Sequence, residues 1–282
     1  MVLPKEIQFS QGSLQDYIDC PRRFQLRYVK RLRWPAIETK PVLENERHLR
    51  HGADLHRLIR QHVMGIPVPT LSRSVTDPQL RRWWRNYLEG GPEDLPSERY
   101  PEVMLSTQVG GHRLVARYDL VARDPKGNVL IVDWKTSRKR PRRAWLSERL
   151  QTHVYPYVLV RAAEALGDGR AVQPDRVSMV YWFAGFPSIP ERFAYDAGRY
   201  RGDERYLVDL VEEIAGTVAD CPNGDLLPAT ADEGRCRLCR YRSLCRRGVE
   251  AGWLDEREQE TTSGDPFDFT LDFEQIAELD MA

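Results

Sequence analysis

The stretch that most constrains the fold is residues 112–135 (HRLVARYDLVARDPKGNVLIVDWK), which has the pattern of two buried strands joined by a turn. Arg113–Ala122 and Asn128–Trp134 are apolar and rich in Val, Leu and Ile, as strands usually are. The turn between them contains Pro125, which fixes one φ angle, and Gly127, which permits a positive one. The sequence therefore predicts a β-hairpin here.

This hairpin would carry two carboxylates and a lysine. Asp119 lies in the first strand, and Asp133 and Lys135 lie two residues apart at the end of the second, so the latter two share a face. Carboxylates bind Mg²⁺ or Mn²⁺, which activates water and neutralises charge on a phosphate, and an ammonium group beside the ion can orient the water. Alone, Asp-x-Lys is a common sequence, and a surface hairpin ending in an ion pair is the simpler interpretation.

The charge distribution favours a polyanionic partner. The 282-residue chain has 42 basic and 42 acidic residues, so its formal net charge is zero. Ten of the acidic residues and one of the basic residues lie between Asp255 and Ala282, which leaves 41 basic and 32 acidic residues in 1–254. We therefore predict one basic domain over residues 1–254 and an acidic tail over 255–282, which is flexible or docks on a partner or on the domain's own basic groove.

Helices are predicted before the hairpin. Ser10–Lys30 has apolar residues at helical spacing, with a break at Pro21 next to Cys20. Residues 34–49 look irregular, and a second helix is predicted to open at Gly52 and to reach about Val63. His56 lies at the edge of its apolar face, where a histidine is more often a hydrogen-bonded core residue than a metal ligand.

Further elements follow from the same patterns. Leu146–Leu166 is predicted to be a helix that Pro156 kinks or interrupts, and its Gln151 and Tyr155 share a face. Glu102 would begin a strand, where an exposed strand-end residue is a better interpretation than a metal ligand. The remaining predicted elements are helices Asp77–Leu88, with Trp83 and Trp84 as core residues, and Arg201–Val218, and strands Glu102–Gln108, Val177–Phe183 and Arg192–Tyr195.

A cationic run follows the hairpin. Five basic side chains occupy six consecutive positions: Arg138, Lys139, Arg140, Arg142 and Arg143. Beside a metal site they would bind the phosphates of a nucleic-acid strand, and the alternative is a solvated loop.

The cysteines indicate a second metal site. Cys236, Cys239 and Cys245 form the pattern Cys-x-x-Cys-x-x-x-x-x-Cys in a short basic segment, which is typical of cysteines that share a metal. The fourth ligand would be Cys221, completing a local zinc site, or Cys20, joining the two ends of the chain by closing a very long loop.

The compartment is predicted from absences in the sequence. Five cysteines, an odd number, do not suit a secreted disulfide framework. No apolar run approaches the roughly 20 residues of a membrane span, and Met1–Ser10 lacks the pattern of a signal peptide. We therefore expect a cytoplasmic protein without a membrane partner.

Taken together, the motifs resemble the PD-(D/E)xK nuclease superfamily, and within it the RecB-like branch that carries an iron–sulfur cluster. Asp119 followed by Asp133-Trp134-Lys135 is similar to the superfamily signature, although Tyr118 stands where the name has Pro and Ala116 where the branch often has Gly. The other similar motifs, spread with these over residues 13–245, are Ser13-Leu14-x-x-Tyr17-x-x-Cys20-Pro21-x-x-Phe24, Gly52-x-x-x-His56, Gln151-x-x-x-Tyr155 and the cysteine triplet. CRISPR-associated exonucleases and the nuclease domains of some helicase–nucleases share this arrangement.

The resemblance implies a restriction-endonuclease-like α/β core, with a central mixed β-sheet flanked by helices. It implies a [4Fe–4S] cluster that joins the N-terminal and C-terminal segments through Cys20, Cys236, Cys239 and Cys245. It also implies that Mg²⁺ or Mn²⁺ is bound by His56, Asp119, Asp133 and the main-chain carbonyl of Trp134. Lys135 would assist the attacking water, and Gln151 and Tyr155 would support the site and the DNA.

These expectations lead to a functional prediction with named alternatives. We predict a Mg²⁺- or Mn²⁺-dependent deoxyribonuclease, an exonuclease on single strands or free DNA ends, in DNA repair, recombination or CRISPR-type processing beside a helicase or a CRISPR-associated protein. One alternative is a non-catalytic module that keeps the fold and binds DNA ends or a partner. Another is a zinc-stabilised version that uses Cys221.

Overall fold

The computed structural model describes residues 3–4, 7–34, 40–92, 95–167 and 169–248, without the side chains of 40–43. The predicted acidic tail lies outside the described residues. Within them, no helix is both long and apolar enough to cross a membrane.

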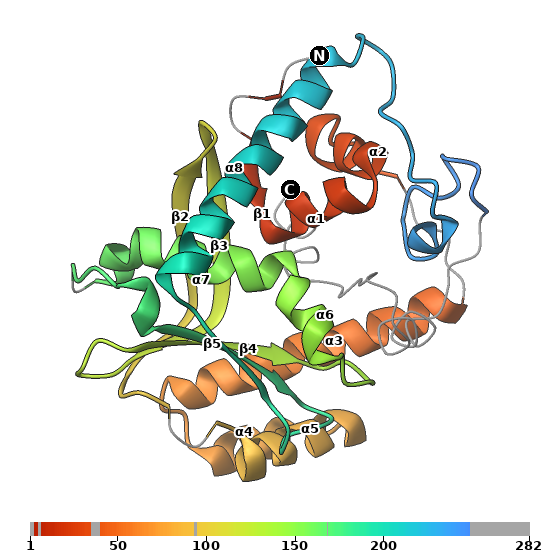
Figure 1. The fold of residues 1–282 in the computed structure, drawn as a ribbon. Helices are drawn as coiled ribbons and strands as arrows, with labels where there is room; N and C mark the ends of the chain where they lie inside the picture. Colours follow the sequence, from red (N-terminus) through yellow and green to blue (C-terminus); the bar gives the residue numbers. More distant parts are fainter. Residues whose placement is uncertain (1–2, 5–6, 35–39, 93–94, 168, 249–282) are drawn as a thin grey trace.

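One mixed sheet lies at the centre of the described part of the chain (Figure 1). Its strands are β1 (Gln8–Ser10), β2 (Glu98–Val109), β3 (His112–Arg123), β4 (Val129–Lys135), β5 (Val177–Phe183) and β6 (Glu191–Ala194). The order is β1-β3-β4-β5-β6, with β2 paired to β3 outside this path. Pairs β1–β3 and β4–β5 are parallel, and β2–β3, β3–β4 and β5–β6 are antiparallel. This confirms the predicted α/β class with a mixed sheet.

The predicted hairpin is β3–β4, and its turn has the expected chemistry. The two strands pair from Leu120↔Val132 to Arg123↔Val129. Gly127 has a φ of 82°, and the Asp124 carboxylate accepts a hydrogen bond of 2.8 Å from the Asn128 backbone N–H. The turn therefore closes the hairpin at the end far from Asp133 and Lys135.

Helices cover both faces of the sheet (Figure 1). On one face lie α1 (Gln11–Asp19), α7 (Leu150–Ala162) and α8 (Ala197–Asp220), and on the other α3 (Lys40–Val63), α4 (Val68–Ser74) and α5 (Pro78–Gly90). Shorter elements are α2 (Pro21–Phe24), the π-helix Gln25–Val29, α6 (Arg143–Glu148) and the 3₁₀ turns Ala163–Leu166, Pro174–Arg176 and Glu233–Cys236. Trp83 and Trp84 of α5 are buried in the second face's core, as predicted.

Two predicted helix boundaries are wrong. The helix predicted to open at Gly52 begins at Lys40, and Gly52 is buried in its interior, so the roughly 1 kcal/mol cost of a helical glycine is outweighed by packing. The helix predicted over Leu146–Leu166 is interrupted at Arg149, which has a ψ of 140°, and not at Pro156. Pro156 is instead buried inside α7, most of whose side chains are enclosed, and tertiary packing offsets its missing hydrogen bond. Strand β1 and helix α4 were not predicted from the sequence.

Candidate active site

Asp119 joins three elements of the fold. Its Oδ1 lies 3.1 Å from Nδ1 of His56 on α3, and its Oδ2 accepts a 2.8 Å hydrogen bond from the backbone N–H of Trp134 on β4. Strands β1 and β4 pair with the same edge of β3. The pairing with β1 ends at Val115, and the pairing with β4 begins at Leu120. Asp119 therefore lies where the sheet opens between these two partners, and a helix side chain can reach it there.

His56 and Asp119 each shift the pKa of the other toward its ionised form, against the effect of burial. Burial alone would raise the pKa of Asp119, but the attraction of His56 and the hydrogen bonds from His56 and Trp134 bring it below its usual value. Burial would likewise lower the pKa of His56, but Asp119, with smaller contributions from Asp133 and Glu102, raises it. Because a metal ion needs a neutral imidazole, metal binding at His56 would compete with protonation of its ring.

A second, buried network forms beside the first. Lys135 Nζ lies 2.8 Å from Asp133 Oδ2 and donates to Gln151 Oε1 at 3.1 Å, and Gln151 Nε2 donates to Asp133 Oδ1 at 2.6 Å. The three residues are buried, which confirms that Asp133 and Lys135 share a face. The amide of Gln151 thus holds both ends of the Asp–Lys pair from α7.

Tyr155 and Trp134 contact the site mainly through their backbones. The Tyr118 hydroxyl donates a 2.9 Å hydrogen bond to the Tyr155 carbonyl, and the two rings lie 4.9 Å apart. The Trp134 ring packs in the core against Trp182, with 5.7 Å between ring centroids. The Tyr155 carbonyl therefore joins α7 to β3 at the residue before Asp119, and the Trp134 ring anchors β4 in the core.

Glu102 is a site residue that sequence reasoning assigned to an exposed strand end. One ligand atom from each of His56, Glu102 and Asp119 lies within 4.8 Å of the others, a group found by searching the described residues. Strand β2 begins at Glu98, so Glu102 is internal, and its φ of 53° is rare for a glutamate. This conformation costs roughly 1–2 kcal/mol, and the Glu102 carboxylate also accepts hydrogen bonds of 3.1 and 2.7 Å from Arg117. No sequence signal identifies a glutamate with a positive φ.

Side chains of β3 alternate between the two faces of the sheet, and this alternation shifts by one residue next to Asp119. Leu114, Ala116 and Tyr118 pack in the core that contains α7, and a period of two would put Leu120 there as well. Instead Val121 lies in that core and Leu120 in the opposite one. A shift by one residue exchanges the faces, so Asp119 sits at the change of phase, where its carboxylate reaches both α3 and β4.

The cationic run after β4 is divided between two roles. Arg140 and Arg143 form ion pairs with the carboxylate of Glu191 on β6, which neutralises part of their charge. Arg138 instead lines a cavity of about 580 Å³ between α3 and α5. Arg142 is exposed, and Lys139 lies between it and Arg138 at partial burial. Two of the five cations of the predicted phosphate track are thus paired with a carboxylate of the protein itself.

Cys20 lies near the C-terminal cysteines, as is required if Cys20 is the fourth ligand. It is the C-cap of α1 and the N-cap of α2 in an extended conformation, and its Sγ accepts from the Thr230 backbone N–H at 3.4 Å. Burial, followed by the charges of Cys20 and Cys245, raises the pKa of Cys236, and burial raises that of Cys239 to about 11, although Arg23 opposes both shifts. All five cysteines are free thiols.

Cys221 has other surroundings. It packs in the main core, where Gln25 Nε2 lies 3.6 Å from its Sγ. Gln25 is buried, donates to the Asp225 carbonyl at 3.1 Å and accepts from the Leu227 N–H at 2.8 Å. Gln25 therefore holds the π-helix after Cys20 to the segment that leads to the cysteine triplet.

This contact gives a stability prediction. Gln25→Ala should lower the free energy of unfolding by about 2–3 kcal/mol, because it leaves the buried Leu227 N–H without its partner. For a domain of this size that is a fall in Tm of roughly 5–10 °C, measurable by thermal unfolding. Gln173→Ala, at an exposed position, is the matched control and should leave Tm unchanged. Equal melting of the two variants would show that Gln25 does not hold these segments together.

Comparisons with known proteins identify a family and structures with a similar fold. The family model of the PD-(D/E)XK nuclease superfamily matches residues 8–246. Among solved structures, one from Eubacterium rectale named "Putative exonuclease" aligns with a TM-score of 0.51 at 10% identity, over 86% of this chain and 88% of that one. The protein SSO0001 aligns with a TM-score of 0.42 at 14% identity, over 86% and 87% of the two chains. No curated protein gave a significant match.

The matched region contains every residue of the two networks described above, from His56 to Gln151, and the cysteine triplet. It therefore covers the fold, the carboxylates at the opening of the sheet and the lysine that follows them. This chain belongs to the PD-(D/E)XK nuclease superfamily.

Proposed function

We propose that the protein is a Mg²⁺- or Mn²⁺-dependent deoxyribonuclease, an exonuclease that acts on single strands or free ends of DNA. The observation that carries the proposal is the juxtaposition of two groups at one opening of the sheet. One is the set of donors on His56, Glu102 and Asp119, and the other is the buried Lys135 ammonium held by Asp133 and Gln151. A structural hairpin does not need both.

The donor set fits a divalent cation that prefers oxygen ligands. Two carboxylates and one imidazole lie within 4.8 Å, a combination that suits Mn²⁺ and, with retained water, Mg²⁺. His56, Asp119, Glu102, Asp133 and the Trp134 carbonyl would hold the ion. When bound, the ion would supply Lewis acidity toward the scissile phosphate and would lower the pKa of a water molecule.

The residues of the chain then have separable roles. Asp119 is oriented by the Trp134 N–H, so its second oxygen is directed to His56 and the ion. Lys135 would orient the attacking water and stabilise the negative charge that develops on the phosphate. Gln151 holds the lysine and Asp133 in one geometry, which reduces the reorganisation that catalysis requires.

We further propose a [4Fe–4S] cluster on Cys20, Cys236, Cys239 and Cys245. All four cysteines are free thiols, and burial raises the pKa of Cys236 and of Cys239, so a cation would stabilise these two thiolates. The cluster's role would be structural.

The proposal about the reaction is tested by cleavage of labelled DNA. Single-stranded and duplex oligonucleotides, linear and circular, are incubated with Mn²⁺ and then with EDTA. We expect shortening of the linear strands only, with Mn²⁺ only. Degradation of circular DNA would contradict the exonuclease assignment. Binding without cleavage at any metal concentration would instead favour a non-catalytic module that binds DNA ends. The superfamily supports a nuclease, the name of the Eubacterium rectale protein supports an exonuclease, and DNA as the substrate follows from the motif resemblance. Repair or CRISPR-type processing, beside a helicase or a CRISPR-associated protein, follows from the motif resemblance.

Glu102 provides a specific test of the metal site. Glu102→Gln keeps the shape of the side chain but removes a negative charge, so the Mn²⁺ concentration for half-maximal activity should rise roughly 10–100-fold. Glu98→Gln, on the same strand and paired with Arg170, is the control and should not change it. A Glu102→Gln enzyme with the wild-type metal requirement would show that Glu102 serves only to bind Arg117.

A further inference from the structure

We infer that the cavity between α3 and α5 is a phosphate-binding subsite for the DNA strand, a few nucleotides away from the scissile bond. This inference rests on the proposed function, and it adds the path that the DNA strand takes over the protein. The cavity holds about 580 Å³, within the range of small-ligand sites. Its lining residues are Glu44, Arg47, His48, His51, Gln79, Arg82, Trp83, Ser137, Arg138, Gly185 and Phe186.

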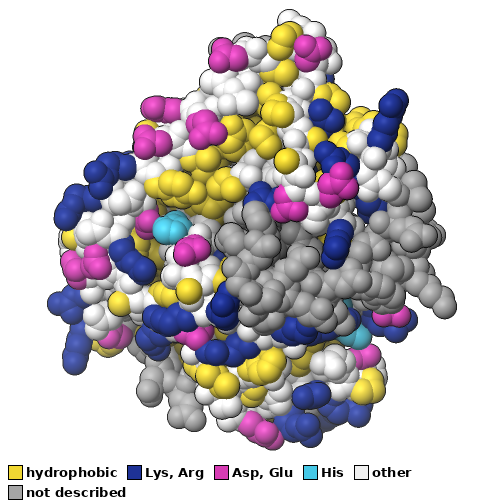
Figure 2. All heavy atoms as spheres, turned by 45° about the vertical axis from the view of Figure 1, so that its right-hand side comes forward, with side chains coloured by type: hydrophobic (Ala, Val, Ile, Leu, Met, Phe, Trp, Pro, Cys, Tyr) yellow, Lys and Arg dark blue, Asp and Glu magenta, His cyan; other side chains and the backbone are white. Residues whose placement is uncertain are grey.

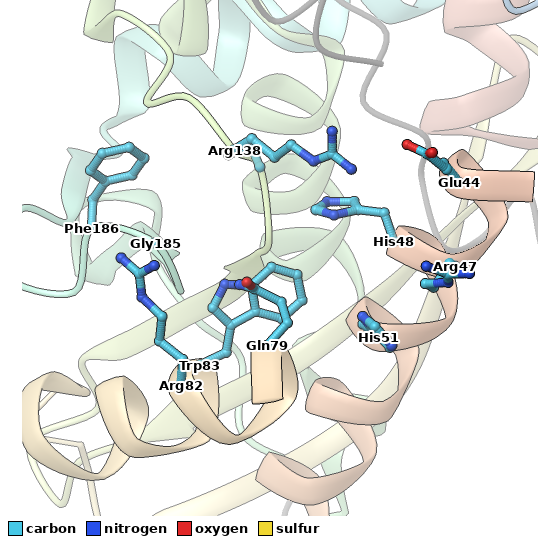
Figure 3. A pocket seen from close by; sticks show the side chains of 11 residues that line it. Glu44, Arg47, His48, His51, Gln79, Arg82, Trp83, Arg138, Gly185 and Phe186 are labelled. Atoms are coloured by element: carbon cyan, nitrogen blue, oxygen red, sulfur yellow. The ribbon is translucent and has the colours of Figure 1, made fainter. Parts of the chain in front are cut away.

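The charge of the lining is the first argument. Three guanidinium groups, Arg47, Arg82 and Arg138, and two imidazoles line the cavity, against one carboxylate, Glu44. Figure 3 shows the arginines approaching from different elements, Arg47 from α3, Arg82 from α5 and Arg138 from the segment after β4. Arg138 extends toward His48, and Arg82 rises toward Gly185. The three guanidinium groups lie at separate places around the cavity, so each can donate paired hydrogen bonds to a different phosphate of a strand that crosses it.

The second argument is that two arginines of the cavity are available. Arg47 and Arg82 are exposed, and among the described residues neither forms a salt bridge. The walls around them are fixed, because His51 Nε2 lies 3.4 Å from the Asp77 carboxylate that caps α5, and the His48 ring packs edge-on against Trp83 at 5.4 Å. The half-buried Phe186 adds an aromatic surface on which a base can stack.

The third argument is continuity with the active site. Ser137 and Arg138 follow Lys135 by two and three residues, and His51 and His48 precede His56 on α3 by five and eight. At 1.5 Å per helical residue these histidines lie roughly 7–12 Å from His56 along the helix axis, about two to four nucleotides of a strand that rises 3.4 Å per phosphate. Figure 2 shows Lys and Arg side chains over the lower part of the molecule, the level at which Figure 1 draws α4 and α5.

The subsite is tested by binding, which does not require cleavage. Arg47→Ala/Arg82→Ala and the wild type are titrated with a fluorescent single-stranded oligonucleotide in EDTA. We expect the Kd of the variant to rise at least tenfold at 0.1 M salt, and the slope of log Kd against log salt to fall by about 1.4, since two phosphate contacts are lost. Arg73→Ala/Arg85→Ala removes two exposed arginines of α4 and α5 that do not line the cavity, and its Kd should change less than twofold.

Two more measurements locate the subsite and separate it from the reaction. A single uncharged methylphosphonate linkage is moved along the strand, and it should weaken wild-type binding two to four nucleotides from the cut but leave Arg47→Ala/Arg82→Ala unaffected. Metal-dependent hydrolysis of bis(p-nitrophenyl) phosphate, too small to span both sites, should be equal in both proteins. Equal loss of affinity in the Arg73/Arg85 control, or none in the Arg47/Arg82 variant, would overturn the subsite. If the wild type did not hydrolyse this compound, the nuclease proposal would be refuted. The subsite would still be judged by the binding measurements.

Discussion

Replacing Lys135 by alanine is expected to slow DNA cleavage by about 10³-fold while leaving the protein folded. The ammonium group lies at hydrogen-bonding distance from both Asp133 and Gln151, and removing one preorganised group that stabilises transition-state charge typically costs two to three orders of magnitude. Asp133 keeps the hydrogen bond from Gln151 Nε2 after the change, so its carboxylate is not left without a donor. The initial rate with saturating Mn²⁺ measures the effect.

The same hairpin provides the control. Lys126 lies exposed in the turn at the opposite end, and Lys126→Ala should cleave DNA at the wild-type rate. Thermal unfolding of both variants shows whether loss of activity reflects loss of the fold. Cleavage by Lys135→Ala at the wild-type rate would refute the assignment of Lys135 and with it the proposed active site.

Replacing Cys20 by serine is expected to remove the proposed cluster, and with it the brown colour of the protein. Wild-type protein purified without oxygen should contain about four iron ions per chain and a broad absorbance in the visible, and Cys20→Ser should lose most of both. A cluster that joins α1 and α2 to the C-terminal segment contributes to folding, so Tm should fall by roughly 10 °C or more.

Cys221 is the matched control for this experiment. Its sulfur packs beside Gln25 in the main core, so Cys221→Ser should keep its iron. The converse result, with iron or zinc lost in Cys221→Ser and kept in Cys20→Ser, would assign the fourth ligand to Cys221. A colourless wild-type protein that contains zinc would refute the iron–sulfur cluster and favour the zinc alternative.

Several features of this protein are local, and the sequence was enough to predict them. The β3–β4 hairpin is specified by two apolar runs and by a turn in which Gly127 takes a positive φ. Asp133 and Lys135 share a face because they are two apart in a strand, and both contact Gln151. The superfamily was predicted from the spacing of the motifs and is confirmed over residues 8–246. The RecB-like branch and the cluster stay predictions.

Other features depend on contacts between distant segments, which no local pattern encodes. The phase shift of β3 at Asp119 lies where β1 and β4 leave one edge of β3 uncovered, and Glu102, with its positive φ, lies on β2 at the same level. Gly52 lies inside α3 and Pro156 inside α7, although both residues disfavour a helix. Burial against the sheet offsets their helix-propensity cost of about 1–3 kcal/mol.

The sequence by itself therefore determined the superfamily and the hairpin, and it supplied most of the candidate site residues, since side-chain identity and short spacing are written in the chain. Only the tertiary structure decided that Glu102 joins His56 and Asp119, that Cys20 rather than Cys221 lies near the triplet, and that Arg138 lines a cavity while Arg140 pairs with Glu191. The physical reason is that these neighbours come from elements far apart in the sequence, and the packing of the whole sheet sets the distances between them.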